Sequence, residues 1–243
     1  MMMSASLQVS VVVPAYNEES NIAVLLEKTA KVLEKQHANY EIILVDDGST
    51  DETFLVAAKL ARKNGKISIF KHSIKRGKSL CLKTGFSHCK GEAIVIMDAD
   101  LQYDPGEIPI LLNVLEKEYD VANGWRDFSK YLSDKTTISR IYNYFTKRLI
   151  GGNVHDLNCG FKAFRRSVVD DLLKKIKWRR GVHRYLISIC KFLGYRIAEA
   201  RVSLNPRGTG RSKYGFARLI EGASLLFLLF LKIRVLNNRG IPL

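Results

Sequence analysis

The first 125 residues alternate between short apolar runs and amphipathic segments, and this alternation constrains the fold more than any other feature. Residues 7–13 predict a buried strand that stops before Pro14, and residues 18–33 predict an amphipathic helix. The same pattern recurs with strands at 40–45, 66–71, 93–97 and 119–123 and helices at 49–63, 77–89 and 105–117. Such alternation predicts an α/β fold with a mostly parallel central sheet and helices on both faces.

Beyond residue 125 the pattern becomes less regular. It predicts helices at 133–149, 166–176 and 181–193, a loop with a short strand at 151–164, a strand at 196–203, and a basic loop at 205–213 before a last helix. No stretch rich in Pro or Ser separates these segments. We therefore expect residues 1–243 to form a single domain.

Positive charge is concentrated in the second half of the chain. Residues 1–125 contain 14 Lys and Arg against 17 Asp and Glu, a net charge of −3, whereas residues 126–243 contain 25 against 7, a net charge of +18. This asymmetry indicates an anionic partner: nucleic acid, the phosphates of a small substrate, or an acidic membrane surface. Nucleic acid is the weakest of these readings, because aromatic residues are not interleaved with the basic ones and no zinc or helix-turn-helix pattern is present.

The cysteines and the apolar runs bear on where the protein works. The four cysteines form no C-x-x-C pair, which predicts reduced thiols in a cytosolic protein, and residues 1–10 lack the features of a signal peptide. The longest apolar run, residues 223–231, is well short of the ~20 residues that cross a bilayer. Two placements suit it, burial in the core or the membrane interface.

Two carboxylates follow the buried-looking strand at 93–97. Asp98 and Asp100 are two residues apart, so on an extended segment they would point to the same face, which Gln102 continues. Their hard oxygens suit Mg²⁺ or Mn²⁺, ions that commonly clamp substrate phosphates. The alternative is an acidic corner exposed to solvent.

Other polar residues lie at the ends of the expected strands. Asp46 and Asp47 end the second strand, where a carboxylate can bind a nucleobase or ribose, although Ser49 there also suits a helix cap. Gly77 and Lys78 open the third helix, where backbone N–H groups and a cation favour an anion. The loop at 205–213 combines glycines with Arg and Lys, as a diphosphate site requires. The alternatives here are a basic helix start and a solvated loop.

Six ordered motifs together carry a resemblance to a known family. The chain resembles an inverting family-2 glycosyltransferase of the GT-A fold and, more narrowly, is similar to dolichol-phosphate mannose synthases and bacterial polyprenyl-phosphate hexosyltransferases. The resemblance covers nearly the whole chain, and its motifs are residues 11–19, 46–49, 76–78, 98–102, 156–162 and 207–213.

The resemblance implies a role for each matching residue. The nucleoside would be held by Pro14, Tyr16, Glu18 and Asp46, the metal on the diphosphate by Asp98, Asp100 and Gln102, and the diphosphate from the other side by Arg207 and Lys213. Arg126 and Arg140 match the arginines expected at the phosphate of a lipid acceptor, since guanidinium groups bind phosphate in bidentate geometry. Asp156 is the candidate carboxylate near the reacting centre, and the alternatives for an aspartate at the start of a loop are a cap or a salt-bridge partner.

The implied reaction transfers mannose or glucose, from GDP-mannose or UDP-glucose, to a polyprenyl or dolichyl phosphate with inversion and a divalent metal. An acceptor phosphate is already anionic at neutral pH, so it can attack the anomeric carbon without a strong base. The alternative within the same fold is a glycan or protein acceptor. Ser79 and Trp125 depart from the family pattern, so the resemblance does not fix the pocket wall or the donor.

The resemblance also divides the expected domain. Residues 1–125 would bind the nucleotide, residues 126–213 would bind the acceptor, and residues 214–243 are a possible membrane-interface helix. We therefore expect a peripheral protein at the cytoplasmic face of a membrane, with an anionic lipid surface or a membrane protein as its partner.

Overall fold

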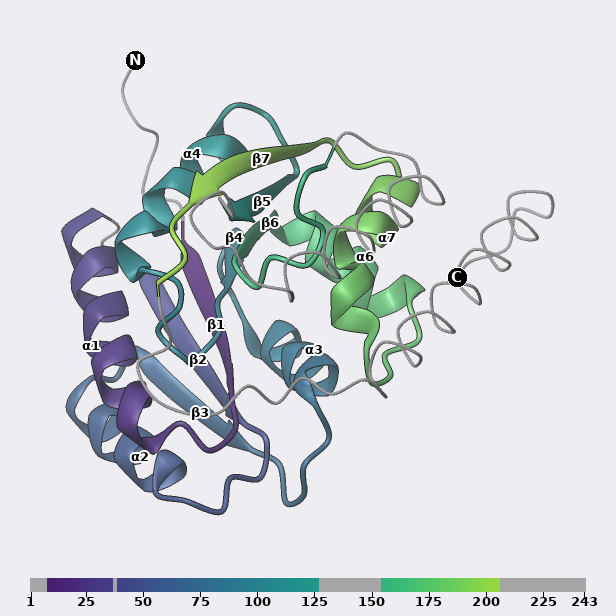
Figure 1. The fold of residues 1–243 in the computed structure, drawn as a ribbon. Coiled ribbons are helices and arrows are strands. Elements are labelled where there is room, and N and C mark those ends of the chain that lie inside the picture. Colours follow the sequence, from purple (N-terminus) through teal and green to yellow (C-terminus); the bar gives the residue numbers. More distant parts are fainter. Residues whose placement is uncertain (1–7, 37–38, 127–153, 206–243) are drawn as a thin grey trace.

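The predicted alternation of strands and helices is confirmed. The computed structural model describes residues 8–36, 39–126 and 154–205 (Figure 1). The first half contains β1 (Val9–Ala15), α1 (Glu19–Gln36), β2 (Tyr40–Asp46), α2 (Thr53–Lys63), β3 (Ile67–Lys71), α3 (Lys78–His88), β4 (Ala93–Ile96), the 3-10 turn η1 (Pro105–Glu107), α4 (Ile108–Glu116) and β5 (Val121–Arg126). The second half contains β6 (Lys162–Arg165), α6 (Arg166–Lys175), the 3-10 turn η3 (Val182–Tyr185), α7 (Leu186–Phe192) and β7 (Ile197–Val202). The helices expected at 133–149 and after residue 213 lie outside the described residues.

Two element boundaries differ from the prediction for identifiable reasons. β1 continues through Pro14, because its pairing with β4 ends at Val12 and the missing N–H of Pro14 leaves no bond to β4 unmade. α2 begins at Thr53 rather than at residue 49, because Ser49 and Thr50 instead bind the backbone or side chain of Asn17 in the loop after β1.

The central sheet has the strand order β3-β2-β1-β4-β6-β5-β7. β3, β2, β1 and β4 are parallel, as are β5 and β7, whereas β6 is antiparallel to both of its neighbours, β4 and β5. The sheet is therefore mostly parallel, as predicted. This arrangement also gives β1, β2, β4, β5 and β7 one common direction, so their carboxyl ends meet at one edge of the sheet.

Helices cover both faces of the sheet and divide the core into two (Figure 1). α1, α2 and α4 pack on one face, and α3, α6 and α7 pack on the other. Alternate residues of β1 follow this division, with Val11 and Val13 in the first core and Val12 in the second. All four cysteines are buried and none forms a disulfide, as predicted.

None of the helices in the described ranges has the length and apolar character needed to cross a membrane.

Candidate active site

The loops after β1 and β2 are joined by hydrogen bonds that fix the first candidate residues. The backbone N–H of Asn17 donates to Ser49 Oγ at 2.9 Å, and Thr50 N donates to Asn17 Oδ1 at 2.9 Å. The backbone N–H of Glu18 donates to Thr53 Oγ1 at 2.7 Å. The half-buried Tyr16 and Glu18 are thus held at the carboxyl end of β1, beside Pro14.

Asp46 lies at the end of β2 and is fully buried. Its Oδ1 accepts hydrogen bonds from the backbone N–H of Ser49, at 3.0 Å, and from Ser49 Oγ. Its Oδ2 is buried and has no hydrogen-bond partner among the described residues. An unpaired buried carboxylate oxygen is costly, so this atom is the position at which a ligand donor would be most favourable.

Asp47, by contrast, binds the loop that precedes α3. Its Oδ1 accepts from Arg76 N at 2.8 Å and lies 3.0 Å from His72 Nδ1, and its Oδ2 accepts from Gly77 N at 2.7 Å. Both oxygens are therefore engaged within the protein. Asp47 holds the turn at Gly77, where φ is 94°.

His72 and Asp47 also lie near Cys81, and the three ligand atoms are within 4.8 Å of one another. Burial raises the pKa of the Cys81 thiol, which disfavours the thiolate that binds metals. Because the Asp47 oxygens are already hydrogen-bonded, this buried group is better explained as the support of the loop than as a metal centre.

Asp98 and Asp100 do not continue the strand, which corrects the extended geometry expected for them. β4 ends at Ile96, residues 99–100 form a turn, and Leu101 has a φ of 60°. Gln102 N donates to Asp100 Oδ1 at 3.3 Å, the type of bond by which an aspartate stabilises a local turn. Asp98 forms an ion pair with Lys78, the first residue of α3.

A second loop packs directly on Asp98. A Cβ atom added to Gly160 would lie 2.9 Å from the carboxyl carbon of Asp98 and still closer to Oδ2, so a larger residue at this position would require the Asp98 carboxylate to move. Gly160 N donates to Tyr103 Oη at 2.9 Å, and the buried Lys162 Nζ donates to the carbonyl of Cys159. The loop at 156–160 is thereby fixed against the loop at 98–103.

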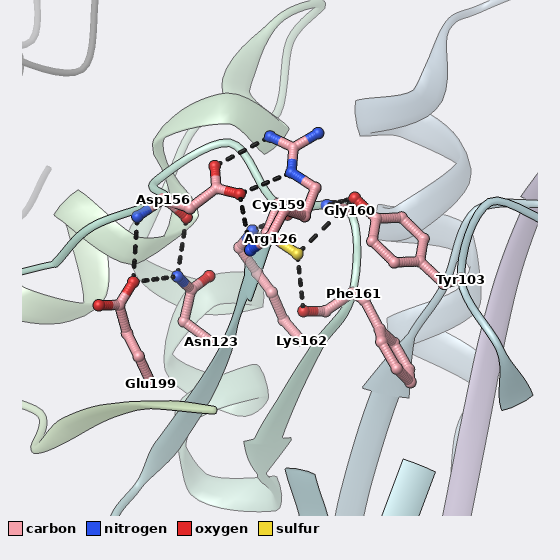
Figure 2. A network of polar contacts seen from close by, with 9 residues as sticks. All are labelled: Tyr103, Asn123, Arg126, Asp156, Cys159, Gly160, Phe161, Lys162 and Glu199. Atoms are coloured by element: carbon pink, nitrogen blue, oxygen red, sulfur yellow. Dashed lines mark hydrogen bonds and ion pairs between the residues drawn. The ribbon is translucent and has the colours of Figure 1, made fainter. Parts of the chain in front are cut away.

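Arg126 and Asp156 form a buried ion pair at the end of β5 (Figure 2). Arg126 Nε lies 2.6 Å from Asp156 Oδ2, and Nη2 lies 2.9 Å from Oδ1. The side chain of Asp156 is 1% exposed and that of Arg126 18%. Burial alone would lower the pKa of Arg126, but the hydrogen bonds to Asp156 outweigh it and the pKa is raised. The guanidinium therefore stays charged and has a fixed orientation.

Behind Asp156 lie two residues that no sequence motif singled out. Asn123 Nδ2 donates to the carbonyl of Asp156 at 2.8 Å and to Glu199 Oε1 at 3.1 Å (Figure 2). A signal was nevertheless present, since Glu199 is an acidic residue inside an otherwise largely apolar strand pattern.

Ser79 and Trp125, the two residues that depart from the family pattern, each contact a histidine. Ser79 Oγ lies 2.8 Å from His183 Nδ1, which joins α3 to η3. Trp125 stacks on His155 with ring centroids 4.4 Å apart. Arg140, Arg207 and Lys213 lie outside the described residues.

Known proteins resemble this chain in sequence and in structure. The family model described as Glycosyl transferase family 2 matches residues 10–173. The dodecaprenyl-phosphate galacturonate synthase of Rhizobium johnstonii is 33% identical over 241 residues, which cover 94% of this chain and 69% of that protein.

Two crystal structures of glucosyl-3-phosphoglycerate synthase from Mycobacterium tuberculosis share the fold at 20% sequence identity. The complex with Mn²⁺, UDP and glucosyl-3-phosphoglycerate has a TM-score of 0.67, covering 97% of this chain and 81% of that one. The complex with Mn²⁺, UDP-glucose and phosphoglyceric acid has a TM-score of 0.71, covering 93% and 79%. The predicted GT-A fold is confirmed, and with the match over residues 10–173 it follows that the chain is a glycosyltransferase that belongs to glycosyl transferase family 2.

Proposed function

We propose that this protein transfers a hexose from a nucleotide sugar to a polyprenyl phosphate, with inversion and with a divalent metal ion. The observation that carries the proposal is the fixed, buried pair of Arg126 and Asp156, whose loop packs on Asp98 through Gly160. A cationic acceptor site and an acidic donor site are therefore neighbours. The name of the Rhizobium johnstonii relative, a dodecaprenyl-phosphate galacturonate synthase, supports a lipid phosphate as the acceptor.

The donor side uses the carboxyl ends of β1, β2 and β4. The unpaired Oδ2 of Asp46 would accept a hydrogen bond from the base or ribose of the nucleotide, beside Pro14, Tyr16 and Glu18. Gly77 and Lys78, at the start of α3, would face the diphosphate.

The residues of the 98–102 turn fit a divalent ion. Asp98, Asp100 and Gln102 offer only oxygen ligands, the set that Mg²⁺ and Mn²⁺ prefer, and Asp98 is held close to Gly160. When bound there, such an ion would neutralise charge on the leaving nucleoside diphosphate. The two M. tuberculosis complexes contain Mn²⁺, one with UDP and the other with UDP-glucose, which supports this choice.

The acceptor side uses Arg126, together with Arg140. Since both oxygens of Asp156 bind Arg126, we infer that Asp156 orients the guanidinium rather than removing a proton. A phosphate monoester needs no strong base, because it is already anionic. Its oxygen forms the new bond to the anomeric carbon as the bond to the nucleoside diphosphate breaks, which inverts that carbon. Positioning and charge stabilisation thus account for the catalysis.

The charge distribution suggests where the reaction occurs. We propose that the protein is peripheral at the cytoplasmic face of a membrane, because residues 126–243 have a net charge of +18 and the acceptor is a lipid. The proposed partner at the membrane is either the anionic lipid itself or a membrane protein.

A transfer assay tests the proposed function. The whole chain is incubated with Mn²⁺, polyprenyl phosphate and radiolabelled UDP-glucose, GDP-mannose or a UDP-hexuronate, and the label is partitioned into butanol. We expect one donor to give label in the lipid phase, and this label should be lost when the metal is removed. In Asp100→Asn it should fall at least a hundredfold, because the metal site would lose one of its two charged ligands. Label that moves only to water-soluble glycan or protein would favour the alternative acceptors.

A further inference from the structure

The side chain of Glu199 accepts an unusual number of hydrogen bonds for a residue in a strand. It lies on β7 opposite Asn123 of β5. Its Oε1 accepts from Asn123 Nδ2 and from the backbone N–H of Asp156, both at 3.1 Å. Its Oε2 accepts from the backbone N–H of His155 at 2.8 Å and lies 2.7 Å from His155 Nδ1. One carboxylate therefore binds two consecutive backbone N–H groups of the loop.

These bonds connect β7 to the acceptor site. The loop residue that Glu199 fixes, Asp156, in turn receives the Nε, Nη2 and backbone N–H of Arg126, the last at 3.4 Å (Figure 2). Asn123 reinforces the connection by donating to the Asp156 carbonyl at 2.8 Å. The series of contacts runs from Glu199 through Asp156 to the guanidinium without interruption.

We infer that Glu199 is a positioning residue for the acceptor phosphate: it fixes Asp156 and, through Asp156, the direction of the Arg126 guanidinium. The inference rests on the proposed function, in which Arg126 binds that phosphate. Glu199 cannot bind the phosphate itself, because a carboxylate repels an anion and its side chain is only 11% exposed. Its effect on the reaction is therefore indirect.

Both carboxylate oxygens of Glu199 are needed for this role, because each of them accepts a hydrogen bond from one backbone N–H. A glutamine offers one oxygen and one NH₂ group. Whichever way the amide turns, its NH₂ faces the backbone N–H of either the exposed His155 or the buried Asp156, and that N–H loses its bond to residue 199. Glu199→Gln should consequently weaken the attachment of the loop although it preserves the size of the side chain.

Steady-state kinetics of the whole chain distinguish a positioning role of Glu199 from a purely structural one. In Glu199→Gln we expect the KM for polyprenyl phosphate to rise about tenfold, while kcat at saturating acceptor and the KM for the donor change less than twofold. The control is Glu41→Gln. Glu41 lies at the start of β2, away from the site, and accepts hydrogen bonds from Ser10 Oγ, at 2.6 Å, and from Lys90 N. Both bonds end on Oε1, which the amide oxygen of glutamine can replace, so this variant should leave the acceptor KM unchanged.

A double variant tests whether Glu199 acts through Asp156. If it does, Asp156→Asn with Glu199→Gln should have an acceptor KM no higher than Asp156→Asn alone. Additive increases would contradict the inference. So would an unchanged acceptor KM in Glu199→Gln, or a donor KM that rises as much as the acceptor KM.

An NMR measurement tests the positioning role of Glu199 independently of the proposed function. The Nε–H resonance of Arg126, identified by its loss in Arg126→Lys, should shift or broaden in Glu199→Gln and stay unchanged in Glu41→Gln. If wild-type protein transfers no sugar to lipid phosphate, the proposed function fails, yet this resonance still decides whether Glu199 orients Arg126. An unchanged resonance would overturn the inference.

Discussion

Gly160 lets two loops approach each other closely because it has no side chain. The structure places it against Asp98, where a Cβ would overlap the carboxylate that we assign to the metal site. The sequence motif at 156–162 contained this glycine, but its partner lies more than 60 residues away and no spacing rule could identify it. A close approach between two loops is a property of the folded chain alone.

We predict that Gly160→Ala lowers transfer about a hundredfold, because displacing a metal ligand by about 1 Å is enough for such a loss. The matched control is Gly65→Ala, since a Cβ at Gly65 would have nothing within 4 Å. Initial rates at several Mn²⁺ concentrations measure the effect, with circular dichroism to confirm folding. A folded Gly160→Ala chain with wild-type rates would show that Asp98 does not hold the metal.

Lys162 is the second residue whose environment could not be read from the sequence. It lies on β6 opposite Asn123, is 2% exposed, and donates from Nζ to the carbonyl of Cys159. Burial lowers its pKa to about 8. In a sequence so rich in lysine, nothing distinguished this one from the many at the surface.

The lowered pKa predicts a component of stability that increases with pH. Between about pH 8 and an ordinary lysine pKa of 10.5, the unfolded chain binds more protons at this position than the folded chain, so the free energy of unfolding rises. The increase is at most about 1.4 kcal/mol per pH unit. Urea unfolding at pH 7, 8 and 9 should show it as a difference between wild type and Lys162→Met.

The exposed Lys191 provides the comparison for this measurement. Lys191→Met should follow the wild-type pH profile, because this side chain on α7 is in solvent. Parallel profiles for wild type and Lys162→Met from pH 7 to 9 would mean that Lys162 is charged in the folded protein at all these pH values.

At the scale of elements, periodicity predicted the strands and helices of the first half well, because each has a regular apolar pattern and a buried face. It did not predict that β6 would enter the sheet antiparallel between β4 and β5. That position depends on long-range pairing, which a local pattern does not encode. The same limit explains Glu199, whose role arises only when β7 pairs with β5.

The 98–102 segment shows a related limit. The identity of the carboxylates was evident from the sequence, but the extended geometry assigned to them was wrong, because β4 ends at Ile96 and the chain turns. Local hydrogen bonding by Asp100 competed with the strand and prevailed. Residue types therefore indicated the chemistry more reliably than the backbone that presents them.

At the scale of the whole molecule, the uneven charge and the proposed lipid acceptor point to the same half of the chain. The acceptor side of the site, with Arg126, belongs to the half with a net charge of +18. That half also contains the apolar run at 223–231, within the segment 214–236 that we expect to be an amphipathic helix. This segment lies outside the described residues, so its expected membrane contact remains a prediction.

We predict that the whole chain floats with vesicles containing anionic lipid and that salt weakens this binding without abolishing it. Each Lys or Arg near the surface adds about 1 kcal/mol that salt screens, whereas insertion of an apolar face is not screened. The double variant Leu226→Ser, Phe230→Ser should therefore lose the part of the binding that persists at high salt. Leu55→Ser, which changes a half-exposed leucine on α2, should float like wild type. Wild-type protein that stays in solution with both anionic and neutral vesicles would place the apolar run in the core and leave the acceptor to be delivered by another protein.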